Sequence, residues 1–279
     1  MSATHPDTDT AGHALTVPSW LPDDAQAELA AAVRTLETSS LAVRLAALAG
    51  STVEGLKRRL PGPMQSVLDW AVRKTLDRAL RAAMATRPDR TPDLGPLKLS
   101  SAWMHRGLAV ASGVAGGTFG LPGTLVELPV STGILLRRIA AIAAEEGEDL
   151  DDPLVAAECM KVFALGGRDP ADDAAESGYF ALRVAMTEML RGGIGRVVGT
   201  VMPGFIGAIA TRFTAPVGMK VTAQAMPLLG AAAGAAVNLA FLEHFSGIAH
   251  AHFTVRRLER EHGAAVVRRA YEDLHDGLA

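Results

Sequence analysis

The chain has 279 residues and a net charge of −3, with 49% hydrophobic residues but only 5% aromatic ones. That length allows one large domain or two small ones, and the near-neutral charge gives no sign of a nucleic-acid-binding protein. The apolar excess consists of Ala, Val, Leu and Gly, which favours close packing of helices over a bulky aromatic core. With Cys159 as its single cysteine the chain forms no internal disulfide, so we expect a cytoplasmic location.

The N-terminal region predicts a tail followed by helices. Residues 1–19 are small and polar, lack the basic and apolar regions of a secretory signal, and are expected to form a disordered tail. Asp23 or Asp24 is expected to cap a helix that extends toward Leu48. A second helix is predicted at 64–84, where one apolar stripe recurs at three- and four-residue spacing. The stripe consists of Met64, Val67, Leu68, Ala71, Leu76, Ala79, Leu80 and Ala83.

The helix at 64–84 also carries a basic face opposite its apolar stripe, and with its neighbours it forms an amphipathic region at 20–86. Such a face with a Trp near its boundary suits an anionic membrane surface. Amphipathicity alone is also what any surface helix of a bundle shows, so a solvated face is the alternative. The residues that we assign to membrane binding are Trp70, Arg73, Lys74, Arg78 and Arg81.

Prolines separate this region from the rest of the chain. Pro88, Pro92 and Pro96 are incompatible with a regular helix at 87–98, which we interpret as a linker. Residues 99–279 then form a helical core in which no convincing strand pattern occurs. The predicted fold is therefore all-α, a multi-helix bundle with Gly-rich apolar helical hairpins.

Helix boundaries in the core are marked by prolines and glycines. An Asp precedes a Pro at 152–153 and at 169–170, the pattern of an N-cap followed by the first helical residue. The glycines at 263 and 277 fit helix C-terminal stops. Between them lies a short amphipathic helix whose apolar positions are Val266, Val267, Ala270, Tyr271 and Leu274.

The stretch GGTFGLPGTLVELP at 116–129 predicts helix packing, not phosphate binding. It lacks the Gly-Lys-Ser/Thr of a phosphate-binding loop and no strand precedes it, so we expect no nucleotide and no other cofactor. Four-residue glycine spacing lets two helices approach closely, as an apolar hairpin with arms at 107–120 and 122–136. Each arm is about 20 Å long, too short to cross the roughly 30 Å hydrocarbon layer. The hairpin is either re-entrant or an ordinary buried pair. The packing residues are Gly113, Gly116, Gly117, Gly120, Pro122 and Gly123, with Asn238 as an amide that bonds across helices further along.

Several polar residues in these apolar surroundings are candidates for function. Glu127 must be paired, protonated or exposed to water, either as a structural partner or as a functional carboxylate. Arg137 and Arg138 are expected at the open end of the hairpin, beside Arg106. Tyr179 and Arg183 lie four apart and so share a helix face, as a packing and ion-pair couple or as part of a site with Glu127.

The sequence contains no recognisable motif for a metal site or for a hydrolase active site. The acidic stretch EEGEDLDD at 145–152 lacks the spacing of a calcium loop and is expected to be a solvated turn that caps the next helix. His244, His250 and His252 do not align on one helix face. There is no G-x-S-x-G nucleophile elbow. We therefore expect no metal site and assign no catalytic residue.

Three stretches together resemble the EcsC family of bacterial proteins: GLPGTLVELPVSTGILLRRIAAIAAEEGED, SGYFALR and AMPLLGAAAGAAVNLAF. Their order and spacing carry the resemblance, which covers about residues 99–253. The family often has Asp before Leu/Ile-Pro, where this chain keeps an acid as Glu127. The resemblance implies an all-helical bacterial protein that is membrane-associated or operates beside membrane systems, the family being named after a protein of an ABC-transporter operon. It carries over no catalytic residue.

The sequence thus favours a lipid-interacting accessory protein, peripheral to the inner face of the membrane. Its expected partner is a lipid surface, or a membrane protein or transporter complex, and not nucleic acid or nucleotide. One alternative is a soluble helical scaffold or interaction protein whose apolar runs are simply core. Another is a hydrolase acting on lipid or peptide.

Overall fold

The computed structural model describes residues 21–48, 50, 52, 55, 62–85, 106–107, 110, 128–167, 178–194, 203–224 and 230–277. Regular structure within these ranges is helical, and no strand occurs in them, which confirms the all-α prediction. The predicted tail at 1–19, the linker at 87–98, the hairpin residues at 113–123 and Glu127 lie outside the described residues. Of Arg81 the structure describes the backbone and not the side chain.

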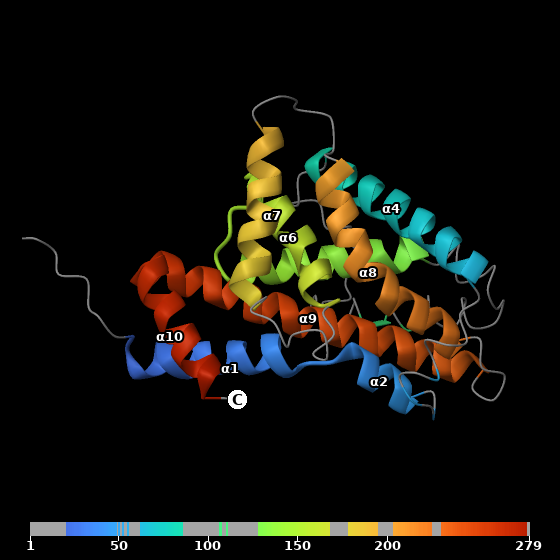
Figure 1. Ribbon diagram of the computed structural model, residues 1–279, viewed down its shortest axis with the longest axis horizontal. Coiled ribbons are helices and arrows are strands. Elements are labelled where there is room, and N and C mark those ends of the chain that lie inside the picture. Colours follow the sequence, from blue (N-terminus) through green and yellow to red (C-terminus); the bar gives the residue numbers. More distant parts are fainter. Residues whose placement is uncertain are drawn as a thin grey trace, which may run out of the picture.

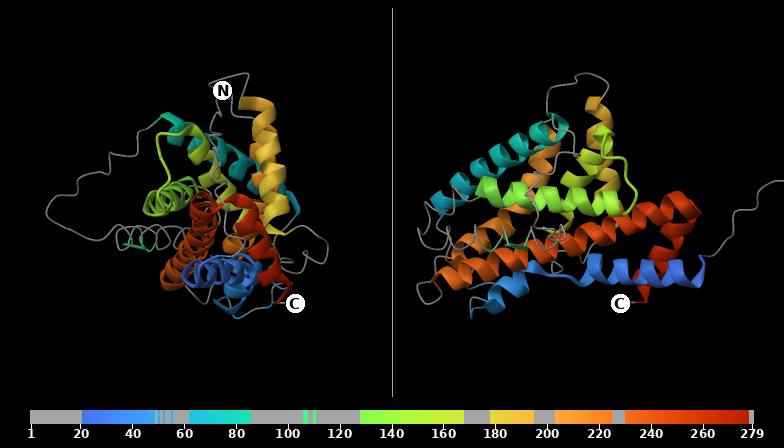
Figure 2. Two further views of the ribbon diagram at one scale, coloured as in Figure 1. Left: turned by 90° about the vertical axis from the view of Figure 1, so that its left-hand side faces the viewer. Right: turned by 180° about the vertical axis from the view of Figure 1, so that it is seen from behind.

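The helices are arranged around one long helix, α9, which at 1.5 Å per residue is about 50 Å long (Figure 1). α1 and α2 follow one side of it in line, and α6 and α8 pack against it from the other side. α4 packs on the outside of α8 and α6, α7 stands across the other helices, and α10 turns at the end of α9 and crosses α1 (Figure 2). The bounds are α1 Asp23–Thr38, α2 Leu41–Leu48, α4 Gly62–Ala85, a helix at 128–145, α6 Pro153–Leu165, α7 Tyr179–Ile194, α8 Pro203–Gln224, α9 Gly230–His262 and α10 Ala264–Asp276.

The first predicted helix is in fact two helices. α1 ends at Thr38, Ser39 is extended (φ −78°, ψ 115°), and α2 begins at Leu41. The break lets both helices turn apolar residues such as Leu29 and Leu45 toward α9. The expected aspartate cap is also wrong: Pro22 holds the N-cap position, and no side chain caps the helix.

The predicted apolar stripe of α4 is partly wrong. Leu68, Val72 and Leu76 form the buried row, at four-residue spacing, whereas Val67 is 45% exposed. The inward face is therefore rotated away from Val67 and takes in Val72 and Thr75, which the sequence pattern left out.

The predicted boundaries in the core are largely confirmed. Asp152 caps α6 by accepting a hydrogen bond from the Leu154 N–H at 2.8 Å, with Pro153 as the first helical residue. α9 ends before Gly263, whose φ of +91° favours glycine, and α10 ends before Gly277. The boundary predicted at 169–170 lies outside the described residues.

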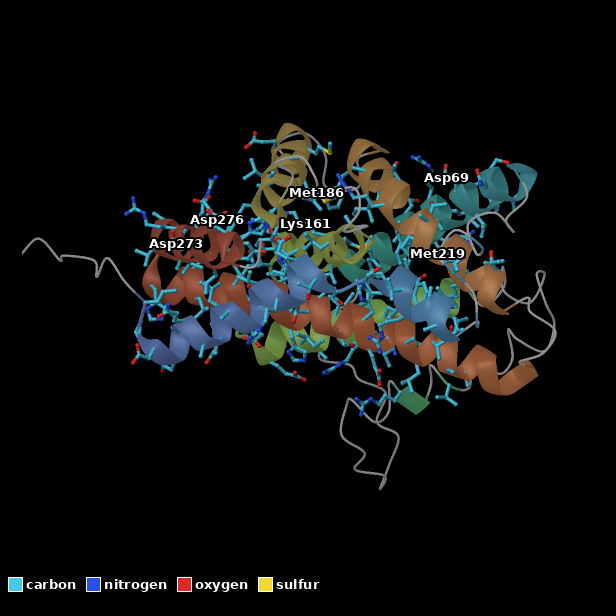
Figure 3. The ribbon with its side chains drawn as sticks, turned by 60° about the horizontal axis from the view of Figure 1, so that its bottom comes forward. Asp69, Lys161, Met186, Met219, Asp273 and Asp276 are labelled. Carbon is cyan, nitrogen blue, oxygen red and sulfur yellow. The ribbon has the colours of Figure 1, made fainter. Side chains whose placement is uncertain are left out.

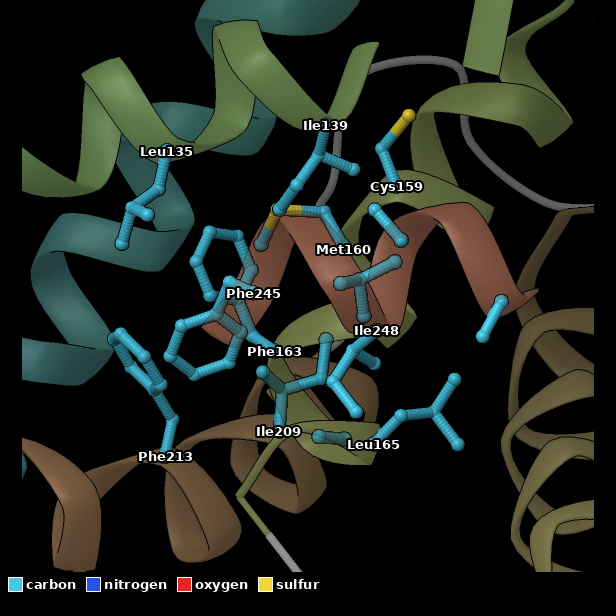
Figure 4. Packing of buried hydrophobic residues seen from close by; sticks show 14 of the residues in the cluster. Leu135, Ile139, Cys159, Met160, Phe163, Leu165, Ile209, Phe213, Phe245 and Ile248 are labelled. Carbon is cyan, nitrogen blue, oxygen red and sulfur yellow. The ribbon is translucent and has the colours of Figure 1, made fainter. Parts of the chain in front are cut away.

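An aromatic cluster fills the centre of the fold, although aromatic residues are scarce in the chain. Phe163, Phe213 and Phe245 pack with ring centroids 4.9 to 5.6 Å apart (Figure 4). The close approach of backbones occurs beside this cluster. A Cβ atom on Gly166 would lie 2.5 Å from the Phe245 ring, and one on Gly167 would lie 2.4 Å from a backbone carbonyl oxygen of α8. Glycine packing is therefore real, at positions that the spacing argument did not single out.

No helix in the described ranges is long and apolar enough to cross a membrane. Residues 221–242 contain no charged side chain, but they are divided between the end of α8 at Gln224 and the start of α9 at Gly230. The second arm of the predicted hairpin is helical from residue 128 and continues past 136 to 145.

Candidate functional site

The exposed side of α4 presents an aromatic residue to solvent. We call Val67, Trp70, Lys74 and Arg78 the α4 outer face, because all four are exposed while Leu68 and its row hold the helix against α8. Trp70 is 61% exposed. The Lys74 ammonium lies 4.4 Å from the centroid of the Trp70 ring, in a cation–π contact between residues one turn apart. The outer face thus joins apolar surface to a positive charge.

The remaining predicted membrane-binding residue whose side chain is described, Arg73, is turned toward α8. Its Nε donates to Asp69 Oδ2 at 2.7 Å. Its guanidinium lies against Gly207 of α8, so that a Cβ added to this glycine would be 3.0 Å from a terminal nitrogen of Arg73. The Thr214 hydroxyl of α8 donates to the other Asp69 oxygen at 3.4 Å. Asp69 therefore compensates the charge of Arg73, whose side chain is still 45% exposed, and Lys74 and Arg78 carry further exposed positive charge on the described part of α4.

Tyr179 lies in a buried polar network instead of an open site. Its hydroxyl lies 2.8 Å from His252 Nδ1, and His252 Nε2 lies 3.2 Å from Glu158 Oε2; Tyr179 and His252 are both 0% exposed. A neutral imidazole with its proton on Nε2 satisfies both contacts, because Nε2–H donates to Glu158 while Nδ1 accepts from Tyr179. Burial lowers the pKa of His252 to about 4, which keeps the ring neutral near pH 7.

Glu158 is the centre of this network. Lys161 Nζ donates to its Oε1 at 2.8 Å, and a terminal nitrogen of Arg256 lies 3.3 Å from the same oxygen. Burial alone would raise the pKa of Glu158, but its hydrogen bond to His252 and the charges of Lys161 and Arg256 lower it well below its ordinary range. In Figure 3, Lys161 lies toward the middle of the molecule, whereas Asp69 lies on α4, nearer its edge. A buried carboxylate of this kind is tolerated because several partners satisfy it.

Arg183 binds Glu259 of α9 with both terminal nitrogens, at 2.9 and 2.6 Å, and its guanidinium lies 3.5 Å from the Tyr179 hydroxyl. Tyr179 and Arg183 share a helix face, and their described contacts are packing and ion pairing. The alternative, a site that includes Glu127, falls on a residue outside the described ranges. The sequence reasoning missed Glu158, Lys161 and Glu259. The first two left a signal, since opposite charges three residues apart in the apolar run LVAAECMKVFAL must pair with each other or with other buried groups.

The acidic turn before α6 is not merely solvated, which corrects the expectation for 145–152. The Glu148 side chain is 5% exposed and accepts from Arg256 at 2.7 and 2.9 Å and from Arg260 at 2.5 Å. Glu146 accepts from Arg257 at 2.9 Å. The turn is therefore clamped onto the C-terminal part of α9, in addition to capping α6 as predicted.

The two arginines expected at the open end of the hairpin have different surroundings. Arg138 is largely buried, donates to Glu145 at 3.1 Å and lies 3.3 Å from a ring nitrogen of His250. Arg137 is exposed. Asn238, predicted to bond across helices, is buried in α9 and lines a small pocket with Lys220 and Phe241, and its bond across helices stays a prediction.

The described part of the chain holds no group of three or more His, Cys, Asp or Glu residues that could bind a metal ion. The histidines predicted to lie apart do so: His244 bonds the Gly166 carbonyl oxygen at 2.8 Å, whereas His252 belongs to the polar network. Burial raises the pKa of Cys159 to about 12, so its thiol stays protonated and behaves as a small core residue. Tyr179, His252 and Glu158 form a hydrogen-bonded chain that connects α7, α9 and α6. Burial closes this chain to solvent.

Comparison with known families finds a match between residues 20–258 and the family model described as EcsC protein family. The match begins ahead of α1, so it takes in the N-terminal helices that the resemblance described above did not cover, and it ends before α10. No curated protein matches the chain, and no solved structure does.

Proposed function

The chain belongs to the EcsC protein family, and we propose that it is a peripheral membrane protein that docks on anionic lipid through the α4 outer face. The negative surface potential of the cytoplasmic leaflet attracts basic segments, so we place the protein on that side of the membrane. Docking there would bring it beside membrane-protein partners such as a transporter complex.

One observation carries the proposal: the indole of Trp70 is 61% exposed, with the Lys74 ammonium 4.4 Å from its ring centroid. A Trp side chain has an apolar body and one polar N–H, a combination that favours the boundary between lipid tails and headgroups. A Lys beside it keeps its charge in the headgroup region while its stem covers apolar surface. Val67 adds further apolar surface to the same exposed side.

The charge on the α4 outer face supports anionic over neutral lipid. Each Lys or Arg near an anionic surface contributes about 1 kcal/mol, so Lys74 and Arg78 together contribute roughly 2 kcal/mol. Ions screen this attraction, and binding should therefore weaken as salt is raised.

Flotation with lipid vesicles tests the proposal. We expect the full-length protein to float with vesicles of phosphatidylcholine and phosphatidylglycerol, and much less with phosphatidylcholine alone. Trp70→Ala should reduce the partition coefficient about tenfold, because it removes more than 1 kcal/mol of apolar insertion. Lys74→Glu changes the charge by two units and should reduce it roughly thirtyfold.

Arg34→Glu is the matched control. Arg34 is an exposed residue of α1, which lies along the far side of α9 from α4 (Figure 1). Its reversal changes the net charge as Lys74→Glu does and should leave flotation nearly unchanged. Equal recovery on both vesicle types, or equal losses from the two reversals, would refute α4 docking. A chain that binds neither vesicle type would instead favour the soluble scaffold.

A further inference from the structure

α7 meets the body of the protein through two neighbouring rows of residues, an apolar row with Leu182 and Met186, which are 8% and 1% exposed, and a polar row. Tyr179, Arg183 and Thr187 are spaced four apart, which places them on one side of the helix. Each of them contacts a polar or charged partner on another helix, so every turn from 179 to 187 has a polar attachment. We call these three residues the α7 polar stripe.

The partners of the stripe lie on α6 and α9. Lys161 Nζ of α6 donates to the Thr187 hydroxyl oxygen at 2.8 Å. Arg183 donates twice to Glu259 of α9, at 2.9 and 2.6 Å. α7 itself packs most closely against α8 and α6, so long side chains make the connection to α9.

Such attachments hold a helix less firmly than apolar packing does. A buried hydrogen bond adds little net stability, and a buried ion pair often adds little more than its desolvation cost. α1 meets α9 through buried apolar side chains such as Leu29 and Val33, whereas α7 combines its buried Leu182 and Met186 with the polar attachments. α7 also turns Val184 and Met189 toward solvent.

The first turn of α7 is anchored differently from the rest. Tyr179 stacks on Tyr271 of α10 with ring centroids 5.4 Å apart, and Phe180 meets the same ring at 5.0 Å. Apolar aromatic contacts thus fix the end of α7 next to α10, while its Ile194 end projects beyond the other helices (Figure 1).

From this asymmetry we propose that α7 is a detachable helix, which swings away from α6 and α8 about its first turn, and that Arg183 and Thr187 of the α7 polar stripe set how often it opens. Opening uncovers the buried Glu158–Lys161 pair and the apolar face of α7 that carries Met186. The fold thereby contains a closed and an open form that differ in one element, as is typical of helices at the low-stability end of a structure.

The Tyr179–His252 contact lies at the first turn of α7, about which the helix swings, and it is kept near neutral pH. Burial lowers the pKa of His252 to about 4, so its Nδ1 is free to accept from Tyr179. The other charged groups that face this ring are Glu158 of α6, Arg183 of α7 and Arg256 of α9.

Hydrogen–deuterium exchange read by mass spectrometry tests the proposal on the full-length protein. Amides of α7 should exchange at least tenfold faster than those of α6 and α9. Thr187→Val removes the oxygen that accepts from Lys161 and should accelerate exchange in α7 about fivefold more, the equivalent of a 1 kcal/mol hydrogen bond. Lys161 keeps its contact with Glu158, so the variant leaves that charge paired.

Thr214→Val of α8 is the matched control, since Thr214 also bonds the carbonyl four residues back and reaches a side chain on another helix. It should leave exchange in α7 unchanged. Arg183→Lys keeps the charge but loses the two-pronged contact with Glu259, and it gives a second measurement should Thr187→Val fold poorly. Equal protection of α7 and α9, or an acceleration by both α7 variants that is the same in every helix, would overturn the proposal.

Discussion

Two buried histidines of α9 predict that the protein loses stability as the solution becomes mildly acidic. His244 and His252 are almost fully buried, and burial lowers the pKa of each to about 4 from an ordinary value of 6.5. Arg44 lowers the pKa of His244 further, while the Gly166 carbonyl raises it. Glu158 opposes the shift of His252.

The direction in which the unfolding free energy changes with pH depends on whether the folded or the unfolded state binds more protons. Between pH 6.5 and pH 4 the unfolded histidines are protonated and the folded ones are not, so the free energy of unfolding falls as the pH falls. The stabilisation is complete above the unfolded pKa and is lost on the way down to the folded one. Linkage gives a loss of about 2 kcal/mol per histidine between pH 7 and pH 5, or about 4 kcal/mol for both.

Urea unfolding followed by circular dichroism at pH 7, 6 and 5 measures this loss. The unfolding midpoint should fall with pH, and His244→Asn or His252→Asn should each remove about half of the pH dependence, whatever the variant's stability at pH 7. An unfolding free energy that is flat from pH 7 to pH 5 would refute the reasoning. So would a dependence that both variants leave intact.

Two further pairs of variants test the packing and the network. Gly167→Ala places a Cβ 2.4 Å from a backbone carbonyl oxygen of α8 and should lower the unfolding free energy by about 1–3 kcal/mol. Its control is Gly178→Ala, whose Cβ meets no described atom within 4 Å and should change the unfolding free energy little. Equal urea midpoints for the two variants would contradict the close approach at Gly167. Tyr179→Phe leaves Nδ1 of His252 without its donor and should lower the unfolding free energy by about 1–3 kcal/mol. Tyr271→Phe loses a bond to a half-buried carboxylate of α1 and should lower it less. Thermal unfolding compares the two variants, and a larger loss of stability in Tyr271→Phe would argue against the buried network.

The fold class and several helix boundaries could be predicted because they depend on local chemistry. Asp152 before a Pro and the glycine at 263 act within one turn of chain, and α6 begins and α9 ends where expected. The break after Thr38 could not be predicted in this way. It depends on how α1 and α2 each meet α9, which is set by residues far along the chain.

The residues of the candidate site also differ in whether nearby or distant parts of the sequence determine their surroundings. The exposure of Trp70 could be predicted only in part, because the sequence pattern placed Val67 in the buried row and left out Val72, whereas in the structure Leu68 and Val72 face inward. The ion pair of Arg183 was anticipated, but its partner Glu259 lies 76 positions away and left no local trace. Burial of Glu148 was missed for the same reason, because an acidic turn seems solvated until the arginines of α9 are placed against it.

The central position of α9 has a consequence for how the chain is made. Glu28 of α1 pairs with Arg257 of α9 across 229 positions of sequence, and α1 and α2 both bury their apolar faces on this helix. During synthesis the two N-terminal helices therefore leave the ribosome long before the surface that covers them exists. Their leucine faces stay open to other hydrophobic surfaces for that interval, so we expect the nascent chain to need protection from aggregation and to fold slowly for an all-helical protein.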